Sequence, residues 1–392
     1  MTTAPLPVHP FPARMAPELA LKRLPRRLDR KIRVLDPMMG SGTIPVLAAL
    51  QGYRAVGFDS DPLAVIIART NGRPIDEQEV LSAAERVATF ARASSATRYV
   101  HADAETQDFI DYWFDEKAQG RLGALAAAIT ECGDDVADPL WCGFSRLIVT
   151  KDAGASRARD VSHSRPHRVR DVASFDPIER FEGAVRAVVQ RHRQVAPKRP
   201  ADGRLRLGRG DARDLPIRSN SIDLVMTSPP YLQAIDYLRG HRMSLVWMGY
   251  TIGELRELRG DSIGTERGSD LETRHKALIR RTAKDVISPR STRIIARYLT
   301  DLGSVLTEVA RVLKPDGRAT FVVADATIEG KPVSICHITK GLAKLAGLRT
   351  VEQQRREIPT ARRYLPPPTA GGGNTLDKRM RVEHCLTFAL NS

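Results

Sequence analysis

The chain has 392 residues and a formal net charge of +15, with 61 lysines and arginines against 46 aspartates and glutamates. No apolar run is long enough to span a bilayer and the first residues show no signal-peptide pattern, so a membrane or secreted protein is not expected. The four cysteines have no C-x-x-C spacing, which argues against a structural zinc site and a disulfide scaffold. We expect a cytoplasmic protein without a metal, and the positive charge favours nucleic acid as a partner.

The first organised segment, residues 32–69, alternates short apolar runs with helical patterns. Strands are predicted at 32–35 and 54–59, and helices from Thr43 to about Leu50 and over 62–69. Thr43 is the predicted N-cap of the first helix, with Pro45 tolerated in its first turn. This order of strands and helices predicts a parallel sheet.

A turn rich in small residues, "DPMMGSGT", joins the first strand to the first helix. Its glycines, Gly40 and Gly42, let a ligand approach the backbone, and the helix that follows presents free N–H groups. Asp59 lies about 20 residues on, where an acidic side chain reaches ribose hydroxyls in nucleotide-binding folds. Because Pro45 replaces the third glycine of the dinucleotide fingerprint, a ligand with adenosine but no pyrophosphate fits better, and S-adenosylmethionine is the obvious one.

A second motif follows the predicted strand 222–226 and consists of Ser228, Pro229, Pro230 and Tyr231. The prolines stiffen the loop and lack N–H groups, so the loop offers carbonyl acceptors and few donors. Together with the flat ring of Tyr231, such a loop can hold a planar group that carries an NH2; alternatively, it simply ends a strand, with a tyrosine in the core. Asp211, at the end of the predicted strand 205–207, can accept a hydrogen bond from an adenine amino group or merely cap a turn.

The remaining chain separates into a C-terminal third and an insertion. The C-terminal third predicts a helix, a Pro-Asp-Gly turn and a strand at 319–323, then a helix over 333–347 and strands at 348–358 and 382–390. Residues 71–200 interrupt the sheet between its second and third strands and contain helical patterns at 80–93, toward the end of 112–129, and at 181–194. The basic stretch 156–171 is either a phosphate-contacting part of a target-recognition region or a solvated linker; its arginines are Arg157, Arg159, Arg165, Arg168 and Arg170. A second basic stretch lies at 274–293.

These motifs, in this order, resemble those of the DNA amino-methyltransferases. The family's D-P-x-M-G-S-G-T turn matches residues 36–43, and its S/D/N-P-P-Y/F motif matches residues 228–231. The N-terminal "HPFPARMAPELA", with Phe11 and Pro12, resembles the family's segment that closes over the methionine end of the cofactor. Met38 stands where the family usually has phenylalanine. The resemblance covers roughly residues 1–70, 203–250 and 300–390.

The resemblance implies a Rossmann-like class I methyltransferase fold, an α/β fold with a mostly parallel seven-stranded sheet, a late antiparallel strand and a largely helical insertion. The catalytic core would comprise residues 1–70 and 201–392, and residues 71–200 the insertion. Ser228, Pro229, Pro230 and Tyr231 would be the catalytic residues. The residues that would bind S-adenosylmethionine are Phe11, Pro12, Asp36, Met38, Gly40, Ser41, Gly42, Thr43, Asp59 and Asp211.

The implied activity is site-specific methyl transfer to the exocyclic amino group of a flipped base in double-stranded DNA, inside a nucleoid-associated cytoplasmic protein, with a cognate restriction endonuclease as a possible partner. Serine before the two prolines is commoner in N4-cytosine enzymes of the family, which favours cytosine N4 over adenine N6. One alternative is methylation of an amino group in tRNA. Another is a degenerate relative that only binds nucleic acid, although the intact motif residues argue against it.

Overall fold

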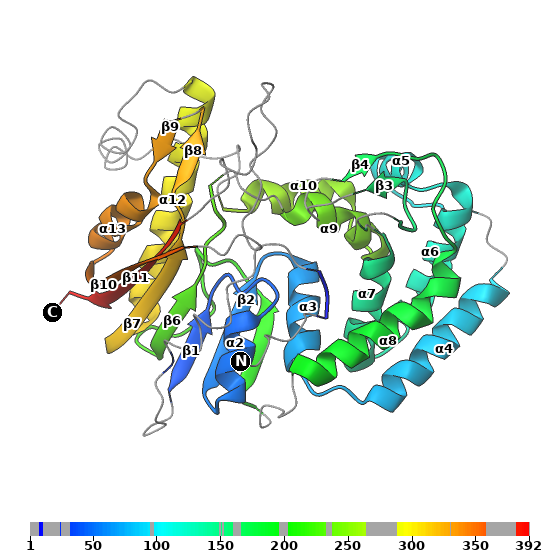
Figure 1. The fold of residues 1–392 in the computed structure, drawn as a ribbon, viewed down its shortest axis with the longest axis horizontal. Helices are drawn as coiled ribbons and strands as arrows, with labels where there is room; N and C mark the ends of the chain where they lie inside the picture. Colours follow the sequence, from blue (N-terminus) through cyan, green and yellow to red (C-terminus); the bar gives the residue numbers. More distant parts are fainter. Residues whose placement is uncertain are drawn as a thin grey trace.

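The computed structural model describes residues 8–10, 24, 32–94, 98–148, 150, 153–159, 166–195, 203–232, 237–263, 288–329, 331–357 and 382–391. A seven-stranded sheet forms one half of the molecule and a body of helices the other (Figure 1). The strands, in their order across the sheet, are β10 (Leu348–Glu357), β11 (Val382–Leu390), β7 (Leu313–Val323), β6 (Ile222–Thr227), β1 (Arg33–Asp36), β2 (Arg54–Asp59) and β5 (Leu205–Arg209). Because β11 alone runs antiparallel to its neighbours, the structure confirms the predicted sheet.

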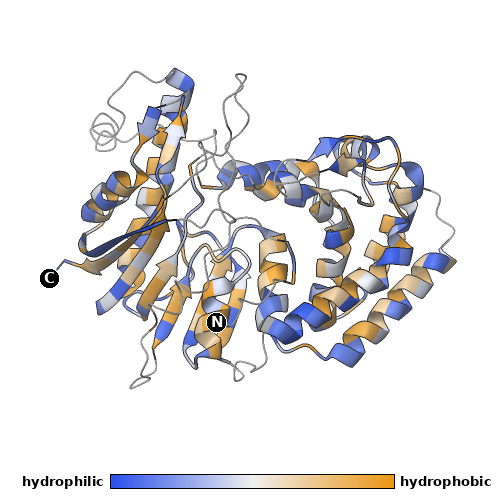
Figure 2. Ribbon diagram, in the orientation of Figure 1, coloured by the Kyte–Doolittle hydropathy of each residue, from blue (hydrophilic) through white to orange (hydrophobic). Residues whose placement is uncertain are grey.

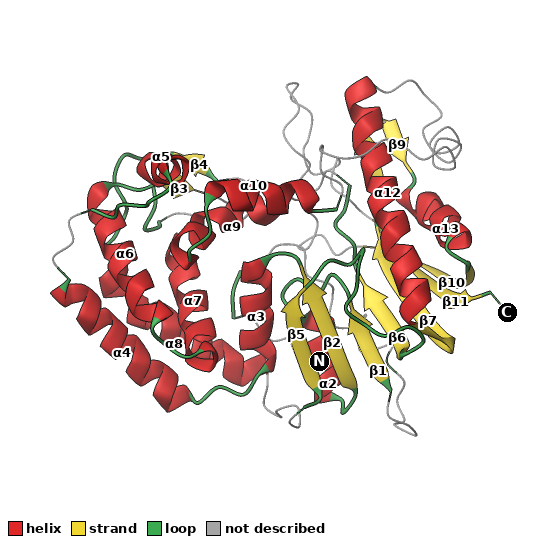
Figure 3. Cartoon of the chain, turned by 180° about the vertical axis from the view of Figure 1, so that it is seen from behind, coloured by secondary structure: helices red, strands yellow, loops and turns green. Residues whose placement is uncertain are grey.

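Helices cover both faces of the sheet. Successive side chains of a strand point to opposite faces, so β1 contributes to two apolar layers. Val34 packs in a cluster with α2 (Thr43–Leu50), whereas Leu35 packs in a cluster with α12 (Pro289–Val312) and α13 (Ile335–Leu345). Figure 1 shows α2 in front of the strands, and the reverse view of Figure 3 shows α12 across the opposite face. The central strands are predominantly apolar, as a sheet covered on both faces requires, whereas β10 at the edge is mostly hydrophilic (Figure 2).

The helical body forms one apolar cluster of its own. It joins α3 (Pro62–Gly72), beside the sheet, to helices from two separate parts of the chain. From residues 71–200 come α4 (Glu77–Ala93), α5 (Ala104–Trp113), α6 (Glu116–Thr130), α7 (Asp134–Ile148) and α8 (Pro177–Val195). From the segment after β6 come α9 (Tyr237–Leu245), the 3-10 helix η1 (Val246–Met248) and α10 (Ile252–Asp261). Trp247 of η1, for example, meets Phe114 edge to face with ring centroids 5.1 Å apart. The body therefore packs against the chain that leaves the Ser-Pro-Pro-Tyr loop.

Four consecutive helices of this body begin with an aspartate that caps them. The side chains of Asp61, Asp76, Asp103 and Asp115 accept backbone N–H groups in the first turns of α3, α4, α5 and α6. Helix α2 differs: Gly42 is its N-cap, with φ 79°, and among the described residues no side chain caps it. The prediction that Thr43 is the N-cap is therefore wrong, because the turn needs a left-handed residue at its last position and Thr43 is already helical.

Other differences from the predicted elements are local. The Pro-Asp-Gly sequence does not precede the last parallel strand but lies within β7, where the register against β6 jumps from the pair Ile222 and Leu313 to the pair Leu224 and Arg318. Helix α7, which contains Pro139, was not predicted; nor were the hairpins of β3 (Ala158–Arg159) with β4 (His167–Arg168) and of β8 (Ala326–Ile328) with β9 (Lys331–Val333). The predicted helix after Tyr231 is seen from Tyr237 onward. No helix in the described part of the chain is long and apolar enough to cross a membrane.

Candidate active site

The glycine turn and the Ser-Pro-Pro-Tyr loop lie side by side at one edge of the sheet. Their strands, β1 and β6, are parallel neighbours, with Val34 opposite Leu224 and Leu35 opposite Val225. Both strands therefore end at the same edge. Thr227, the last residue of β6, donates a hydrogen bond from Oγ1 to Asp36 Oδ1 over 2.7 Å. This buried contact joins the two loops directly, and Thr227 was not singled out from the sequence.

The glycine turn is held tightly against α3. Gly40 and Gly42 have φ values of 50° and 79°. A Cβ on Gly42 would lie 2.8 Å from the Cβ of Ala68, so only glycine fits there without a shift. On the same side, Asn71 Nδ2 donates a hydrogen bond to the Ser41 carbonyl over 2.9 Å. The turn is thus fixed from α3, and it leaves the N–H groups at the start of α2 without a side-chain cap.

Asp59 connects the end of β2 to the same turn. One of its carboxylate oxygens accepts the Gly40 N–H over 2.8 Å, and the other accepts the Asp61 N–H over 3.0 Å. Asp61 in turn caps α3 and lies 2.5 Å, Oδ2 to Nδ1, from His241 of α9, in a buried pair. Sequence reasoning missed this pair, although an aspartate before Pro62 is a recognisable helix-start signal.

Two aspartates of this edge are weaker acids than usual, because burial raises the pKa of each. Burial raises the pKa of Asp36 to about 7, against the hydrogen bonds from Thr227 and Met38, which lower it. Burial, together with the negative charge of Asp61, raises the pKa of Asp59 to about 6. Two carboxyl groups that titrate near neutral pH therefore lie directly behind the glycine turn.

The Ser-Pro-Pro-Tyr loop is anchored to the two strands beyond β6. Ser228 Oγ donates a hydrogen bond to the Val322 carbonyl of β7 over 3.2 Å. The hydroxyl of Tyr231 donates to Glu383 Oε1 of β11 over 3.0 Å. Pro229 is buried, whereas Ser228, Pro230 and Tyr231 are partly buried. Glu383 has no counterpart in the sequence motif and was not singled out.

Asp211 lies at the same edge but has a close partner. Gly210 N–H donates to the Asp59 carbonyl over 3.1 Å, which brings the end of β5 next to that of β2. The Asp211 carboxylate accepts the Arg213 N–H over 2.8 Å and Arg213 Nη2 over 2.7 Å. Burial opposes ionisation, but these hydrogen bonds outweigh it and lower the pKa of Asp211. The structure shows the turn-capping role directly; contact with an adenine stays a prediction.

The remaining predicted residues occupy varied positions. Met38 is partly buried against the apolar layer under α12, and its N–H donates to Asp36 Oδ1 over 3.1 Å. Ser41 is buried in the turn, and Thr43 is partly buried at the start of α2. Phe11 and Pro12 lie outside the described residues. Just before them, the Val8 carbonyl accepts Arg146 Nη1 over 3.1 Å, and His9 Nε2 lies 3.1 Å from Ser145 Oγ of α7.

The arginines of the basic stretch have mixed surroundings. Arg157 donates to the backbone carbonyls of Asp111 and Asp171, each over 2.7 Å, and so supports the β3–β4 hairpin. Arg168 lies 5.2 Å from the ring centroid of Tyr112 and pairs with Asp171 over 3.0 Å. Arg165 is outside the described residues. Phosphate contact therefore stays a prediction, and Arg157 is committed to the hairpin itself.

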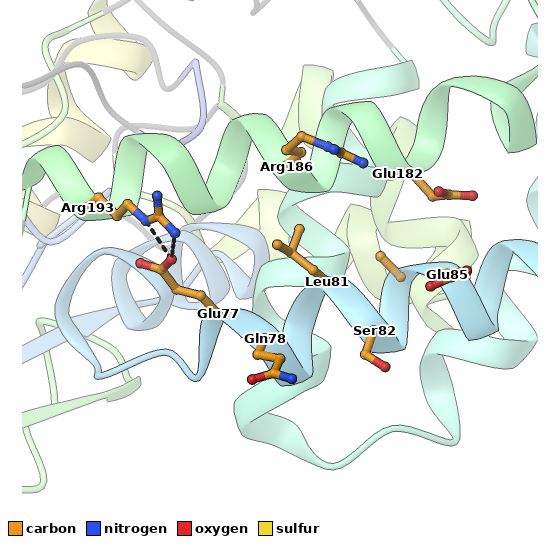
Figure 4. Close-up of a pocket in the computed structure, with 9 residues that line it drawn as sticks. Glu77, Gln78, Leu81, Ser82, Glu85, Glu182, Arg186 and Arg193 are labelled. Carbon is orange, nitrogen blue, oxygen red and sulfur yellow. Dashed lines mark hydrogen bonds and ion pairs between the residues drawn. The ribbon is translucent and has the colours of Figure 1, made fainter.

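A cavity of about 530 Å³ lies elsewhere, between α4 and α8. Its lining comes from these two helices alone and includes an ion pair between Glu77 and Arg193 (Figure 4). None of the predicted site residues lines it, so it is a groove on the helical body and not the site where the two motifs meet. In the ranges described above, no three His, Cys, Asp or Glu side chains are placed to hold a metal ion together.

The chain is similar to several methyltransferases. No protein-family model matches the chain. It is 23% identical over 383 residues to the type II methyltransferase M.MvaI of Kocuria varians, and the alignment covers 90% of this chain and 84% of that protein. It is 23% identical over 168 residues to the type II methyltransferase M.BsoBI of Geobacillus stearothermophilus, 35% and 33% of the two chains. A solved TehB-like S-adenosylmethionine-dependent methyltransferase from Corynebacterium glutamicum aligns over 96% and 86% of the chains, at 10% identity and a TM-score of 0.31.

The observed strand order, with the single antiparallel strand β11, is the Rossmann-like class I fold of S-adenosylmethionine-dependent methyltransferases. The type II methyltransferase relatives confirm the resemblance to DNA methyltransferases drawn from the sequence motifs.

Proposed function

We propose that this protein is a site-specific DNA methyltransferase that transfers a methyl group from S-adenosylmethionine to the exocyclic amino group of a flipped base, with N4 of cytosine favoured over N6 of adenine. The observation that carries the proposal is the 2.7 Å hydrogen bond from Thr227 to Asp36, because it brings the cofactor-type turn and the Ser-Pro-Pro-Tyr loop to one edge. The type II methyltransferases that the chain resembles over most of its length support it.

The residues behind the glycine turn fit an adenosine-containing cofactor. Helix α2 begins with uncapped N–H groups, whereas its neighbours α3 to α6 are capped by aspartates, so donors remain available for a ligand. Asp59 has its carboxylate at the end of β2 with both oxygens oriented by backbone N–H groups, and each oxygen keeps a lone pair for a ribose hydroxyl. Gly42 keeps the backbone clear for close approach.

The Ser-Pro-Pro-Tyr loop is suited to accepting hydrogen bonds from an amino group. Ser228 donates its hydroxyl hydrogen bond to the Val322 carbonyl, so its oxygen presents lone pairs to a ligand. Pro229 has a carbonyl and no N–H, so it too can only accept. Two acceptors are what the two protons of a base NH2 require. Tyr231 provides an aromatic face on which the base stacks.

The chemistry follows from positioning. S-adenosylmethionine supplies a methyl group on a sulfonium, whose sulfur takes the carbon–sulfur electron pair as the amino nitrogen forms its new bond to carbon. Ser228 and Pro229 orient the nitrogen lone pair toward the methyl carbon and reduce its conjugation with the ring. The amino proton becomes acidic only as the bond forms and leaves to water, so no strong base is needed. Orientation of this kind contributes about 7–11 kcal/mol to a reaction barrier.

A base in a duplex cannot reach such a loop, so we propose that the target base is flipped, at a cost of a few kcal/mol. The excess of positive charge supports binding to the phosphate backbone. We propose that residues 71–200, including the β3–β4 hairpin, form a target-recognition region beside a catalytic core of residues 1–70 and 201–392. A cognate restriction endonuclease and a cytoplasmic site at the chromosome are part of the same proposal.

One experiment tests the whole proposal. The protein is expressed in a host without DNA methylation, and the host genome is sequenced by a method that detects modified bases. We expect a methylated base in one sequence context, which gives the target, the base and the nitrogen together. If no DNA mark appears but tritiated methyl groups pass to tRNA, the RNA alternative replaces the proposal. If calorimetry detects no S-adenosylmethionine binding, the non-enzymatic alternative does.

A further inference from the structure

The hydroxyl of Tyr231 contacts a side chain that lies far away in the sequence. It donates a hydrogen bond to Glu383 Oε1 over 3.0 Å, across 152 positions of the chain. The sequence motif accepts either tyrosine or phenylalanine at this position, so a hydroxyl is not required for stacking on a base. Its contact with a carboxylate is a feature of this chain.

Glu383 is itself fixed in place. It is the second residue of β11, with Arg356 of β10 opposite it in the register, and the next residue, His384, pairs with Val323 of β7. Arg356 Nη1 lies 3.8 Å from Glu383 Oε2, so the two carboxylate oxygens face different partners, the tyrosine and the arginine. Both side chains of this ion pair are largely buried, at 21% and 17% exposed. The carboxylate therefore has little freedom to move away from the tyrosine.

The loop that carries Tyr231 is anchored on both sides of the ring, and Leu232, which follows the ring, is buried in the apolar layer under α12. Thr227 is bonded to Asp36 of β1, and Ser228 is bonded to the Val322 carbonyl of β7. These contacts fix the backbone of the loop, and Glu383 contacts the far end of the tyrosine. A hydrogen bond at the hydroxyl oxygen holds the long axis of the ring in one direction, because rotation about the Cα–Cβ bond would move the oxygen away from its acceptor.

We infer that Glu383 is a positioning residue for methyl transfer: through the Tyr231 hydroxyl it fixes the direction in which the ring extends, and so the place where the target base stacks. The inference rests on the proposed function, and it assigns to β11 a part in the site that the motifs do not reveal. Misplacement of a reacting group by about 1 Å can cost about 100-fold in rate. The effect of losing Glu383 should therefore appear in the rate of transfer and not in the affinity for S-adenosylmethionine.

The test uses tritiated S-adenosylmethionine and DNA from a methylation-free host as methyl acceptor. We expect Glu383→Ala and Tyr231→Phe each to lower kcat by about 10- to 100-fold, since both remove the same hydrogen bond. Because the two changes act on one contact, the double variant should be no slower than either single variant. Glu383→Gln should retain most of the rate, since the amide oxygen accepts the same hydrogen bond. The calorimetric Kd for S-adenosylmethionine should stay within about twofold in all four proteins.

Glu357→Ala is the matched control, because it removes an exposed carboxylate one position along β10 from Arg356 and should leave the rate unchanged. The inference is overturned if Glu383→Ala transfers at the wild-type rate, if the losses multiply in the double variant, or if cofactor affinity falls together with the rate. Should Glu383→Ala fail to fold, Tyr231→Phe decides, and a wild-type rate in that variant overturns the inference. A wild-type protein that methylates neither DNA nor RNA overturns the proposed function as well, whereas an active wild type with an unaffected Glu383→Ala overturns the inference alone.

Discussion

The helical body and the edge of the sheet differ in how their helices begin and in which polar groups they bury. The helical body has a continuous apolar interior, and the helices α4, α5 and α6 each begin with an aspartate cap. At the edge of the sheet, α2 has no side-chain cap among the described residues, two glycines have positive φ values, and the buried carboxylate of Asp36 and the partly buried carboxylate of Asp59 accept N–H groups of the glycine turn. Departures from the stabilising rules therefore gather where the two sequence motifs meet, which is the pattern expected of a functional site.

The largest effect should come from the loop at the sheet edge. Replacing Tyr231 by alanine removes the stacking surface while every contact of the glycine turn remains, so methyl transfer should fall by about 100-fold or more. Both Tyr231→Ala and Ser228→Ala should bind S-adenosylmethionine with nearly the wild-type affinity. Tritiated-methyl transfer and calorimetry on the same preparations measure the two quantities. An equal loss of both would contradict the separation between the two loops.

Within the helical body the expected effect is on stability. Phe181 of α8 is fully buried, and Phe181→Ala should lower the free energy of unfolding by about 3–5 kcal/mol. Phe90 of α4 is 58% exposed, so Phe90→Ala serves as the control and should change stability by less than about 0.5 kcal/mol. Urea unfolding measures both. The comparison fails if the two phenylalanines behave alike.

A pH experiment contrasts a buried aspartate of the edge, Asp36, with a partly buried one of the body, Asp103. The pKa of Asp36 in the folded protein is raised from 3.8 to about 7, so its stabilising contribution is complete below the unfolded value and is lost as the pH rises through about 7. Asp36→Asn keeps an oxygen for Thr227 and removes the charge. Going from pH 5 to pH 8, the wild type should therefore lose about 2–3 kcal/mol of unfolding free energy relative to this variant.

Asp103, the cap of α5, provides the opposite case. Hydrogen bonds from Thr106 lower its pKa, so its contribution is present above the unfolded value of 3.8 and is lost only as the pH falls below it. Asp103→Asn should consequently show the same change in unfolding free energy between pH 5 and pH 8 as the wild type. A similar pH response in both variants would show that the edge aspartate is not specially buried.

The smallest effect separates two glycines that share a backbone conformation. Gly42 at the edge has φ 79°, and a Cβ added to it would lie 2.8 Å from the Cβ of Ala68. Gly249 in the helical body has φ 91°, and a Cβ added to it would point into open space. Gly249→Ala should cost about 1–2 kcal/mol in unfolding free energy, for the left-handed backbone alone. Gly42→Ala should cost at least as much and should also weaken S-adenosylmethionine binding, because the turn must shift. Calorimetry on both variants decides whether the cofactor senses the turn; equal affinity in the two would contradict the proposed cofactor site.

Several elements were predictable because their signals are local. The bounds of α2, β2 and β11 agree with the patterns of apolar residues, and the glycine turn and the Ser-Pro-Pro-Tyr loop were recognisable as motifs. Helix α7 was missed because Pro139 interrupts its pattern, although it lies in the helix with its neighbours buried. The Pro-Asp-Gly turn was placed before the strand, whereas β7 accommodates it as an irregularity in pairing with β6.

The sequence by itself determined the kind of sheet, the two loops and the chemistry they favour, because each is encoded within a few consecutive residues. Only the tertiary structure decided which side chains hold those loops. The contacts of Thr227 with Asp36, of His241 with Asp61 and of Tyr231 with Glu383 cross 191, 180 and 152 positions of the chain. Strand order brings Asp36, Thr227 and Glu383 to one edge, and helix packing places His241 of α9 beside the N-cap of α3. No local pattern in a single sequence specifies which distant residue will lie there.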